Sequence, residues 1–321
     1  MQHFETKTGT SLQEAAGWLI AGECIGIPTE TVYGLAANAL DAAAAVKIFE
    51  IKNRPAFNPL IVHVHDAGEF EKYAAEVPEL IKLLAAKFSP GPLTYILPKA
   101  NCIPDIITAG GDTVALRVPA HPLTRELLKL LPFPLAAPSA NPFGYISPVT
   151  AQHVADQLGG KIPFILDGGS CSVGVESTVV TVRDGKLVVL RLGGLSTEAL
   201  ESVVDRVTYE LNESSNPQSP GQLKSHYAPR IPLRLGIPAN EPVNTKVAVL
   251  GFQSVPEWRS VAASEVLSVT GDLNEAARNL FAAMRRLDEA DADVIFAEVL
   301  PNEGLGKAIN DRLKRASVEN F

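Results

Sequence analysis

Cysteine is scarce in this sequence, and the few cysteines have no spacing typical of a cross-link or a metal site. Cys24, Cys102 and Cys171 are widely separated, and no C-x-x-C pair occurs. This arrangement argues against a disulfide framework and against a zinc finger. We therefore expect the protein to work in a reducing compartment, the cytoplasm.

Long hydrophobic runs are missing as well. No apolar stretch approaches the ~18 residues that a membrane-spanning helix needs. The first residues, M-Q-H-F-E-T-K-T-G-T, have neither the basic start nor the apolar core of a signal peptide. We expect neither membrane insertion nor secretion.

An excess of basic residues is also absent, and so are the common glycine-rich nucleotide loops. The net charge of -8 disfavours tight, non-specific binding of nucleic acid, so we expect tRNA or RNA binding to be weak at most. Neither G-x-x-x-x-G-K-[ST] nor G-x-G-x-x-G occurs. A bound nucleotide would have to be held by side-chain cations and hydroxyls instead.

The chain is long enough for two domains with separate cores. Its 321 residues exceed the ~250–300 at which a single core stops growing. The polar stretch 212–220 reads as a linker between two regions in which strand and helix patterns alternate. We predict an α/β protein with an open, twisted mixed sheet in residues 1–208, a linker over 209–230, and a smaller α/β, Rossmann-like domain over 231–321.

Local signals place several elements. Ser11 and Asp41 predict helices that end near Ala21 and Lys52. Ser147, followed by a proline, predicts the start of another helix, whose N-terminus would itself be a good phosphate site. The run 183–186, R-D-G-K, predicts a hairpin between two strands.

The segment 52–63, K-N-R-P-A-F-N-P-L-I-V-H, carries the most chemistry. Lys52 and Arg54 come at a helix end, and a guanidinium grips anionic oxygens in a planar fork. In the strand that follows, His63 and His65 share one face. This pattern suits a nucleotide phosphate, although a solvated helix end before a core strand explains it too. The H-x-H spacing has no third ligand cluster nearby, so we expect no metal site.

Several motifs in order and spacing resemble the threonylcarbamoyl-AMP synthases, the YrdC/Sua5 family. They are G-I-P-T-E-T-V-Y-G-L-A-A-N-A (26–39), the segment 52–63, S-P-G-P-L-T-Y-I-L (89–97), D-T-V-A-L-R-V-P-A-H-P (112–122), A-P-S-A-N-P-F-G (137–144), S-P-G-Q-L-K-S-H-Y-A-P (219–229) and E-G-L-G-K-A-I-N-D-R-L-K-R-A-S (303–317). The last two are similar to the long, two-domain form. Phe143 stands where the family often has serine.

The resemblance implies a YrdC-like fold and a nucleotidyltransferase activity. L-threonine, bicarbonate or CO2, and ATP would give L-threonylcarbamoyl-AMP, pyrophosphate and water. The product would pass to the tRNA threonylcarbamoyltransferase machinery for N6-threonylcarbamoyladenosine modification of tRNA. Mg2+ would accompany ATP, held largely by the nucleotide and water.

The resemblance also implies roles for individual residues. Those expected to contact L-threonine are Thr31, His63, Arg117, Ala137 and Ser177. Those expected to contact ATP are Lys52 (at the phosphates), Arg54, Asn58, Thr113, Ser139, Asn141, Ser147, Arg191 and Tyr227.

Alternatives stay open for some of these positions. Arg117 lies in an apolar strand, where its charge must be paired, so a salt bridge within the fold explains it as well as a clamp on a carboxylate. His63 could be a core histidine. His226 and Tyr227 could anchor the second domain instead of closing the linker over the nucleotide. The second domain has no catalytic constellation of its own, and we interpret it as a lid or regulatory domain.

Two other function classes are compatible with the same fold. One is an RNA-binding module, which the net charge and the lack of a long basic run disfavour. The other is a carbamoyl-transferring hydrogenase-maturation enzyme. Such enzymes carry zinc fingers that the three scattered cysteines cannot build.

Overall fold

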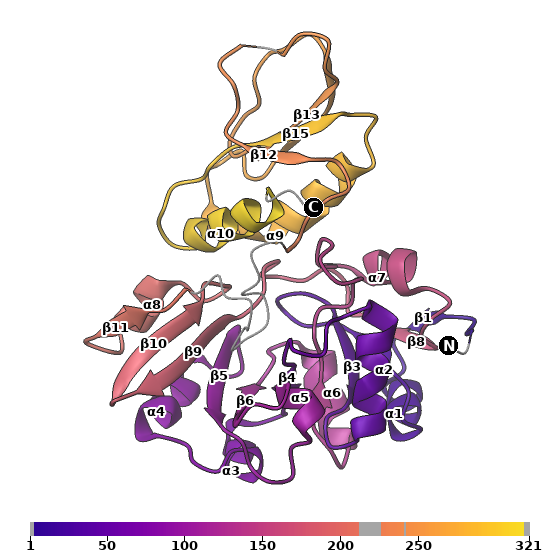
Figure 1. Cartoon of the computed structure of the whole chain (residues 1–321), viewed down its shortest axis with the longest axis vertical. Helices are drawn as coiled ribbons and strands as arrows, with labels where there is room; N and C mark the ends of the chain where they lie inside the picture. Colours follow the sequence, from indigo (N-terminus) through magenta and orange to yellow (C-terminus); the bar gives the residue numbers. More distant parts are fainter. Residues whose placement is uncertain (1–2, 212–225, 241, 318–321) are drawn as a thin grey trace.

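Two sheets organise the chain. The computed structural model describes residues 3–211, 226–240 and 242–317. An 11-stranded sheet, with both parallel and antiparallel pairs, occupies the N-terminal part, and a 4-stranded parallel sheet occupies the C-terminal part (Figure 1). The predicted mixed α/β fold with a second, smaller α/β domain is confirmed. Within these ranges, no helix is long and apolar enough to cross a membrane.

The order of strands in the larger sheet is β1-β8-β2-β3-β7-β4-β6-β5-β9-β10-β11, and in the smaller β12-β15-β13-β14. The strands are β1 (Lys7–Gly9), β2 (Ile25–Ile27), β3 (Gly34–Asn38), β4 (Ile61–His63), β5 (Leu93–Pro98), β6 (Thr113–Arg117), β7 (Leu135–Ala136), β8 (Phe164–Leu166), β9 (Thr178–Arg183), β10 (Lys186–Arg191), β11 (Val207–Tyr209), β12 (Leu233–Leu235), β13 (Val247–Gly251), β14 (Val261–Val266) and β15 (Val294–Ala297).

The helices are α1 (Leu12–Ile20), α2 (Ala42–Lys52), a 3-10 turn η1 (Ala67–Glu69), α3 (Phe70–Tyr73), α4 (Glu79–Phe88), α5 (Asp105–Thr108), α6 (Pro122–Leu130), α7 (Ala151–Leu158), α8 (Thr197–Glu201), α9 (Leu273–Asp288) and α10 (Gly306–Ala316). Larger and smaller sheets are separated by the stretch between β11 and β12, which overlaps the predicted linker. Residues 212–225 of that linker, with the S-P-G motif at 219–221, lie outside the described residues.

Most local signals are confirmed, and one is wrong. The Ser11 and Asp41 side chains accept hydrogen bonds from the first turns of α1 and α2. The hairpin of β9 and β10 turns at Asp184 and its neighbouring glycine, which both have positive φ, as that turn requires. Ser147, however, caps no helix, because α7 begins later and Thr150 is its N-cap.

The sheet register brings distant segments together. In the parallel pair β4–β6, His63 lies opposite Arg117. β5 pairs with β9 in parallel, so that Leu93 lies opposite Thr178. An isolated bridge joins Gly34 to Ser139. The strand ends and turns that carry the family motifs therefore meet at one place.

Successive side chains of β4 point alternately to the hydrophobic core and to a cavity on the other face of the sheet. Val62 is buried in the main hydrophobic core, whereas Ile61 and His63 face a cavity on the opposite side. This face assignment agrees with the alternation predicted from the sequence. His65 lies beyond the strand and pairs with Glu69 at 2.7 Å, which is a local contact.

The second domain lies against the first through its helices. α9 and α10 occupy the side of the smaller sheet that faces the larger domain (Figure 1). Gly174 of the first domain packs on the backbone of α9 so closely that a Cβ there would lie 2.4 Å from the Arg278 Cα. Lys307 of α10 bonds to Glu198 at the start of α8. The C-terminal helices thus cover the edge where the motifs meet.

Candidate active site

A small cavity lies between the first domain and the segment that leads to the second. Its volume is about 50 Å³, enough for water but not for a substrate. The lining consists of Thr31, Val32, Arg54, Ile61, His63, Arg117, Ala137, Pro138, Ser139, Glu176, Ser177, Arg191, His226 and Tyr227. All of the residues expected to contact L-threonine line it, together with four of those expected to contact ATP: Arg54, Ser139, Arg191 and Tyr227.

Three guanidinium groups converge on this cavity. Arg54, Arg117 and Arg191 are 7%, 4% and 4% exposed. Burial, the main cause, lowers the pKa of Arg54 to about 9 and that of Arg191 to about 10. Both remain cationic at neutral pH, so the cavity presents buried positive charge that an anionic ligand would neutralise.

The turn that follows α2 orients the side chain of Arg54. Its Nε donates to the carbonyl of Asn58 at 3.1 Å, and its Nη2 donates to the carbonyl of Pro59 at 2.9 Å. The side chain of Asn58 is fully buried, and neither polar atom of its amide has a partner in the described part of the chain. An unpartnered buried amide costs free energy unless a ligand or water completes it. The ATP contact of Asn58 therefore stays a prediction, which its amide, unpartnered among the described residues, would suit.

Lys52 does not line the cavity. Its ammonium is buried and donates to the carbonyls of Ser139 and Asn141. Burial, followed by the nearby Arg54 charge, lowers the pKa of Lys52 well below its usual value. In this structure Lys52 holds the loop that carries Ser139, and a contact with phosphate would require its ammonium to leave these carbonyls.

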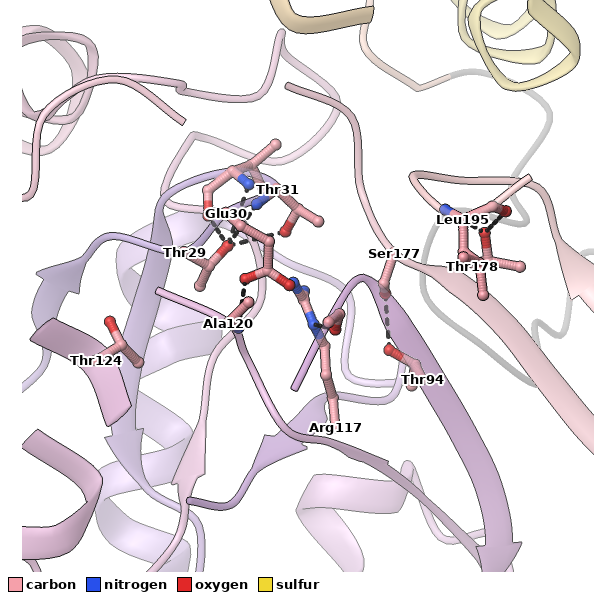
Figure 2. Close-up of polar contacts among 12 residues, drawn as sticks. Thr29, Glu30, Thr31, Thr94, Arg117, Ala120, Thr124, Ser177, Thr178 and Leu195 are labelled. Carbon is pink, nitrogen blue, oxygen red and sulfur yellow. Dashed lines mark hydrogen bonds and ion pairs between the residues drawn. The ribbon is translucent and has the colours of Figure 1, made fainter. Parts of the chain in front are cut away.

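Arg117 makes the internal salt bridge that the sequence left open. Its Nη2 donates to the carboxylate of Glu30 at 2.6 Å, and its Nε donates to the carbonyl of Gly91 at 3.3 Å. The other Glu30 oxygen accepts the backbone N–H of Ala120 (Figure 2). Nη1 of Arg117 has no acceptor among residues 3–211, 226–240 and 242–317, so one donor of the fork stays available beside the cavity. Salt bridge and ligand clamp are therefore compatible.

His63 is a neutral side chain. It is 2% exposed, and burial, reinforced by the charge of Arg117, lowers its pKa to about 3. Nδ1 of His63 has no partner among the described residues. At neutral pH the imidazole offers polar contacts without adding positive charge.

The second domain reaches the cavity through Arg312 of α10. This side chain is fully buried, with Nε 2.8 Å from the Glu176 carboxylate and Nη2 2.9 Å from the Leu192 carbonyl. The other Glu176 oxygen accepts the hydroxyl of Ser147 at 2.6 Å. Although burial opposes ionisation, Arg312 and Arg191 hold the pKa of Glu176 below its usual value.

Tyr227 closes the cavity from the linker side. Its ring stacks on Phe281 of α9 with centroids 5.5 Å apart, and the Arg312 guanidinium lies over it at 5.1 Å. His226 packs between Tyr227 and Phe143. The two linker residues therefore line the cavity and anchor the second domain at the same time.

Thr113 is the predicted site residue that lies apart from this cluster. It begins β6, whereas Arg117 ends it, and its side chain is exposed. It lines a larger hollow of about 900 Å³ over β5, β6 and β9, together with Pro59 and Ile96. Asn141 and Ser147 are buried near the cavity but do not line it.

Sequence reasoning missed three charged residues. Glu30 was within the quoted T-E-T motif, and Arg312 was within the quoted C-terminal motif, so their positions gave a signal. Glu176 directly precedes the predicted Ser177. What the sequence could not indicate is that Glu30 pairs with Arg117 and Glu176 with Arg312.

Comparisons with known proteins agree with this geometry. Residues 18–193 match the model of the Sua5/YciO/YrdC family, described as "Telomere recombination", and residues 195–318 match the model described as "Threonylcarbamoyl-AMP synthase, C-terminal domain".

Two curated relatives and one solved structure cover almost the whole chain. The "Threonylcarbamoyl-AMP synthase" of Pyrococcus abyssi is 42% identical over 315 residues, which is 94% of this chain and 93% of the relative. The protein of the same name from Bacillus subtilis is 39% identical over 320 residues, 95% of this chain and 92% of the relative. The crystal structure of P. abyssi Sua5 complexed with L-threonine has a TM-score of 0.90 and 39% identity, covering 98% of this chain and 97% of that one. The chain therefore belongs to the threonylcarbamoyl-AMP synthase family, in its two-domain Sua5 form.

Proposed function

We propose that this chain makes L-threonylcarbamoyl-AMP from L-threonine, bicarbonate or CO2, and ATP. The observation that carries the proposal is the small cavity in which Arg54, Arg117 and Arg191 meet a neutral histidine and the hydroxyls of Thr31 and Ser177. Buried cations suit a carboxylate and a phosphate chain, and the hydroxyls suit a small amino acid. The names of the curated relatives support the same reaction.

The reaction asks the protein to position charges. The threonine amine attacks CO2 and loses a proton, which forms an N-carboxylate. One carbamate oxygen then attacks the α-phosphorus of ATP, and the bond to the β-phosphate oxygen breaks to release pyrophosphate. No covalent bond to the protein is needed, so orientation and charge neutralisation account for catalysis. Arg117 would hold the amino-acid carboxylate, while Arg54 and Arg191 would face the phosphates.

A nucleotide that contacts Thr113 would have to span two hollows. The turn 57–60 borders the larger hollow, and Ile61, the next residue, lines the small cavity. ATP laid across this turn would place its phosphates near Arg54 and extend its other end over β6 toward Thr113. The ATP role of Thr113 stays a prediction that depends on this extended pose.

We propose that the site widens to admit substrates. A cavity of about 50 Å³ is far below the ~300–1,000 Å³ typical of ligand pockets. Tyr227 and His226 form its linker-side wall, so we propose that they move aside for entry and return during the reaction. Closure would keep water away from a reactive mixed anhydride.

We propose that Mg2+ arrives with ATP. Among the described residues, no group of three histidine, cysteine or acidic side chains could hold a metal by itself. The two carboxylates at the cavity, Glu30 and Glu176, already face Arg117 and Arg312. Phosphate oxygens and water are therefore the ligands that suit Mg2+ here, and it would neutralise phosphate charge.

We also propose that the product is handed to the machinery that modifies tRNA with threonylcarbamoyl groups. We further propose that the reaction takes place in the cytoplasm. A mixed anhydride of a carbamate and a phosphate is an activated group donor. Its chemistry calls for an acceptor amine and a transferase that consumes it promptly.

Incubation with ATP, bicarbonate and L-threonine tests the proposal. Pyrophosphate release should require all three substrates, and omission of threonine should abolish it. Chromatography should show one new adenylate that forms in step with pyrophosphate. Pyrophosphate released at the same rate without threonine would reject the proposal.

A further inference from the structure

Two pairs of buried hydroxyls flank the cavity, and each pair has the same construction. Thr31 and Ser177 line the cavity, whereas Thr29 and Thr94 lie behind them (Figure 2). All four side chains are at most 1% exposed. A hydroxyl has a single proton to donate, so the partner behind each lining hydroxyl decides what that hydroxyl offers to a ligand.

The pair at the N-terminal turn leaves Thr31 as an acceptor. The Thr29 hydroxyl donates to the carbonyl of Val32 at 2.6 Å, because a carbonyl oxygen can only accept. The two hydroxyl oxygens of Thr29 and Thr31 lie 2.8 Å apart, a contact that needs a proton between them. With the Thr29 proton engaged, that proton must come from Thr31. The Thr31 oxygen then faces the cavity with lone pairs.

The pair on the opposite side leaves Ser177 as a donor. Nη2 of Arg191 donates to the Ser177 hydroxyl oxygen at 3.1 Å, and a guanidinium cannot accept. The Thr94 hydroxyl lies 2.7 Å from the same oxygen and has no other acceptor within the described ranges. A buried hydroxyl proton without an acceptor is costly, so Thr94 donates to Ser177. The proton of Ser177 is therefore left for a ligand.

We propose that Thr29 and Thr94 are positioning residues that give the two lining hydroxyls opposite polarity and thereby orient L-threonine. The carboxylate, which only accepts hydrogen bonds, points to Ser177 and Arg117. The side of the amino acid that carries N–H and O–H protons points to Thr31. This inference rests on the proposed function and deepens it.

The charges around the cavity agree with this orientation. Nη2 of Arg117 is tied to Glu30, whereas Nη1 has no acceptor in the described part of the chain and adds a second donor for a carboxylate. The backbone N–H groups of Thr31 and Val32 both lie 3.2 Å from the Thr29 oxygen. These two longer contacts can share one lone pair of the Thr29 oxygen, which leaves the other lone pair for the shorter 2.8 Å contact from the Thr31 hydroxyl.

The test removes the hydroxyls of Thr29 and Thr94, which we call the rear hydroxyls because they lie behind the lining pair. The effect is compared with removal of matched hydroxyls elsewhere. The variants are Thr29→Val and Thr94→Val. The controls are Thr124→Val and Thr178→Val, which remove buried hydroxyls bonded to the carbonyls of Pro28 and Leu195 and absent from the cavity lining. Figure 2 shows both threonines and the contact of Thr178 with Leu195. KM for L-threonine, KM for ATP and kcat are measured for each protein, together with its melting temperature.

Loss of either rear hydroxyl should raise the KM for L-threonine roughly three- to ten-fold, the worth of one hydrogen bond, and leave the KM for ATP within about two-fold. Thr94→Ser and Thr29→Ser, which keep the hydroxyl, should restore the wild-type KM. The two controls should change neither KM. If Thr29→Val fails to fold, the Thr94 pair of variants decides the question alone.

The opposite direction of the hydrogen bond between Ser177 and Thr94 predicts a different result. If Ser177 donated to Thr94, Thr94→Val would free the Ser177 proton, and the KM for L-threonine would stay constant or fall. That outcome, or equal KM values in the variants and controls, would overturn the inference. The proposed function would stand in that case, provided that the wild-type protein is active with threonine. A wild-type protein without threonine-dependent activity would instead reject the function itself.

Discussion

Arg312→Leu should destabilise the whole protein, because it breaks a buried ion pair between α10 and Glu176 at the cavity. The guanidinium is fully buried and lies 2.8 Å from Glu176. Removal of one partner from a buried pair costs ~3–5 kcal/mol. Arg191 still holds down the pKa of Glu176, so we expect the lower end, about 3 kcal/mol.

Lys307→Met is the matched control for this substitution. Lys307 also belongs to α10 and also bonds across the domain interface, to Glu198 at 2.7 Å. That pair is 27% and 46% exposed, and solvent-exposed pairs contribute ~0–1 kcal/mol. The control should therefore lower the free energy of unfolding by less than about 1 kcal/mol.

Urea unfolding of four proteins measures the coupling: wild type, Arg312→Leu, Glu176→Gln and the double variant. The glutamine removes the charge that Arg312→Leu leaves buried and unpaired. The double variant should therefore be more stable than the sum of the single effects predicts, by about 2 kcal/mol. Additive effects, or a loss in Arg312→Leu no larger than in Lys307→Met, would refute the buried-pair reasoning.

Three further predictions concern the cavity. Arg54→Ala should weaken ATP binding by about 1.5–3 kcal/mol, the worth of a charge-assisted contact, which titration calorimetry would measure; unchanged affinity would remove Arg54 from the nucleotide site. Arg117→Ala should raise the KM for L-threonine far more than that for ATP, whereas equal rises with a large fall in melting temperature would leave only its salt-bridge role. Acidification should destabilise the protein, because burial lowers the pKa of His63 to about 3 and that of His226 well below its usual value of 6.5. The unfolded chain then binds more protons than the folded one below pH 6.5, and each histidine should cost about 1.4 kcal/mol at pH 5.5 in chemical denaturation; a free energy of unfolding equal at pH 7.5 and 5.5 would contradict this.

Local signals predicted the elements well where the deciding contacts are themselves local. Asp41 caps α2 through N–H groups two and three residues ahead. Ser147 failed because its hydroxyl goes to Glu176, 29 residues away, while Thr150 offers the cap. A pattern read along the chain contains no information on that competition.

The candidate site shows the same contrast between local signals, which the sequence contains, and long-range contacts, which it does not reveal. The family motifs predicted which side chains meet, because each motif fixes the end of a strand or a turn. They did not predict the carboxylates that hold the cations, since Glu30 and Arg117 are 87 residues apart and Glu176 and Arg312 are 136 apart. Thr113 lies apart from the cavity because it begins β6, whereas Arg117 ends it. A strand rises by ~3.3 Å per residue, so the two side chains are far apart along it.

The fate of the bicarbonate carbon tests the proposed reaction most directly. Wild-type protein is incubated with ATP, L-threonine and isotopically labelled bicarbonate, and the adenylate product is isolated and analysed by mass spectrometry. The label should appear in the product, in a fragment that retains threonine and the carbamoyl carbon, with one pyrophosphate released per adenylate. An adenylate that contains threonine but no label would mean that the amino acid is activated directly through its carboxylate, and it would contradict the assignment of that carboxylate to Arg117 and Ser177.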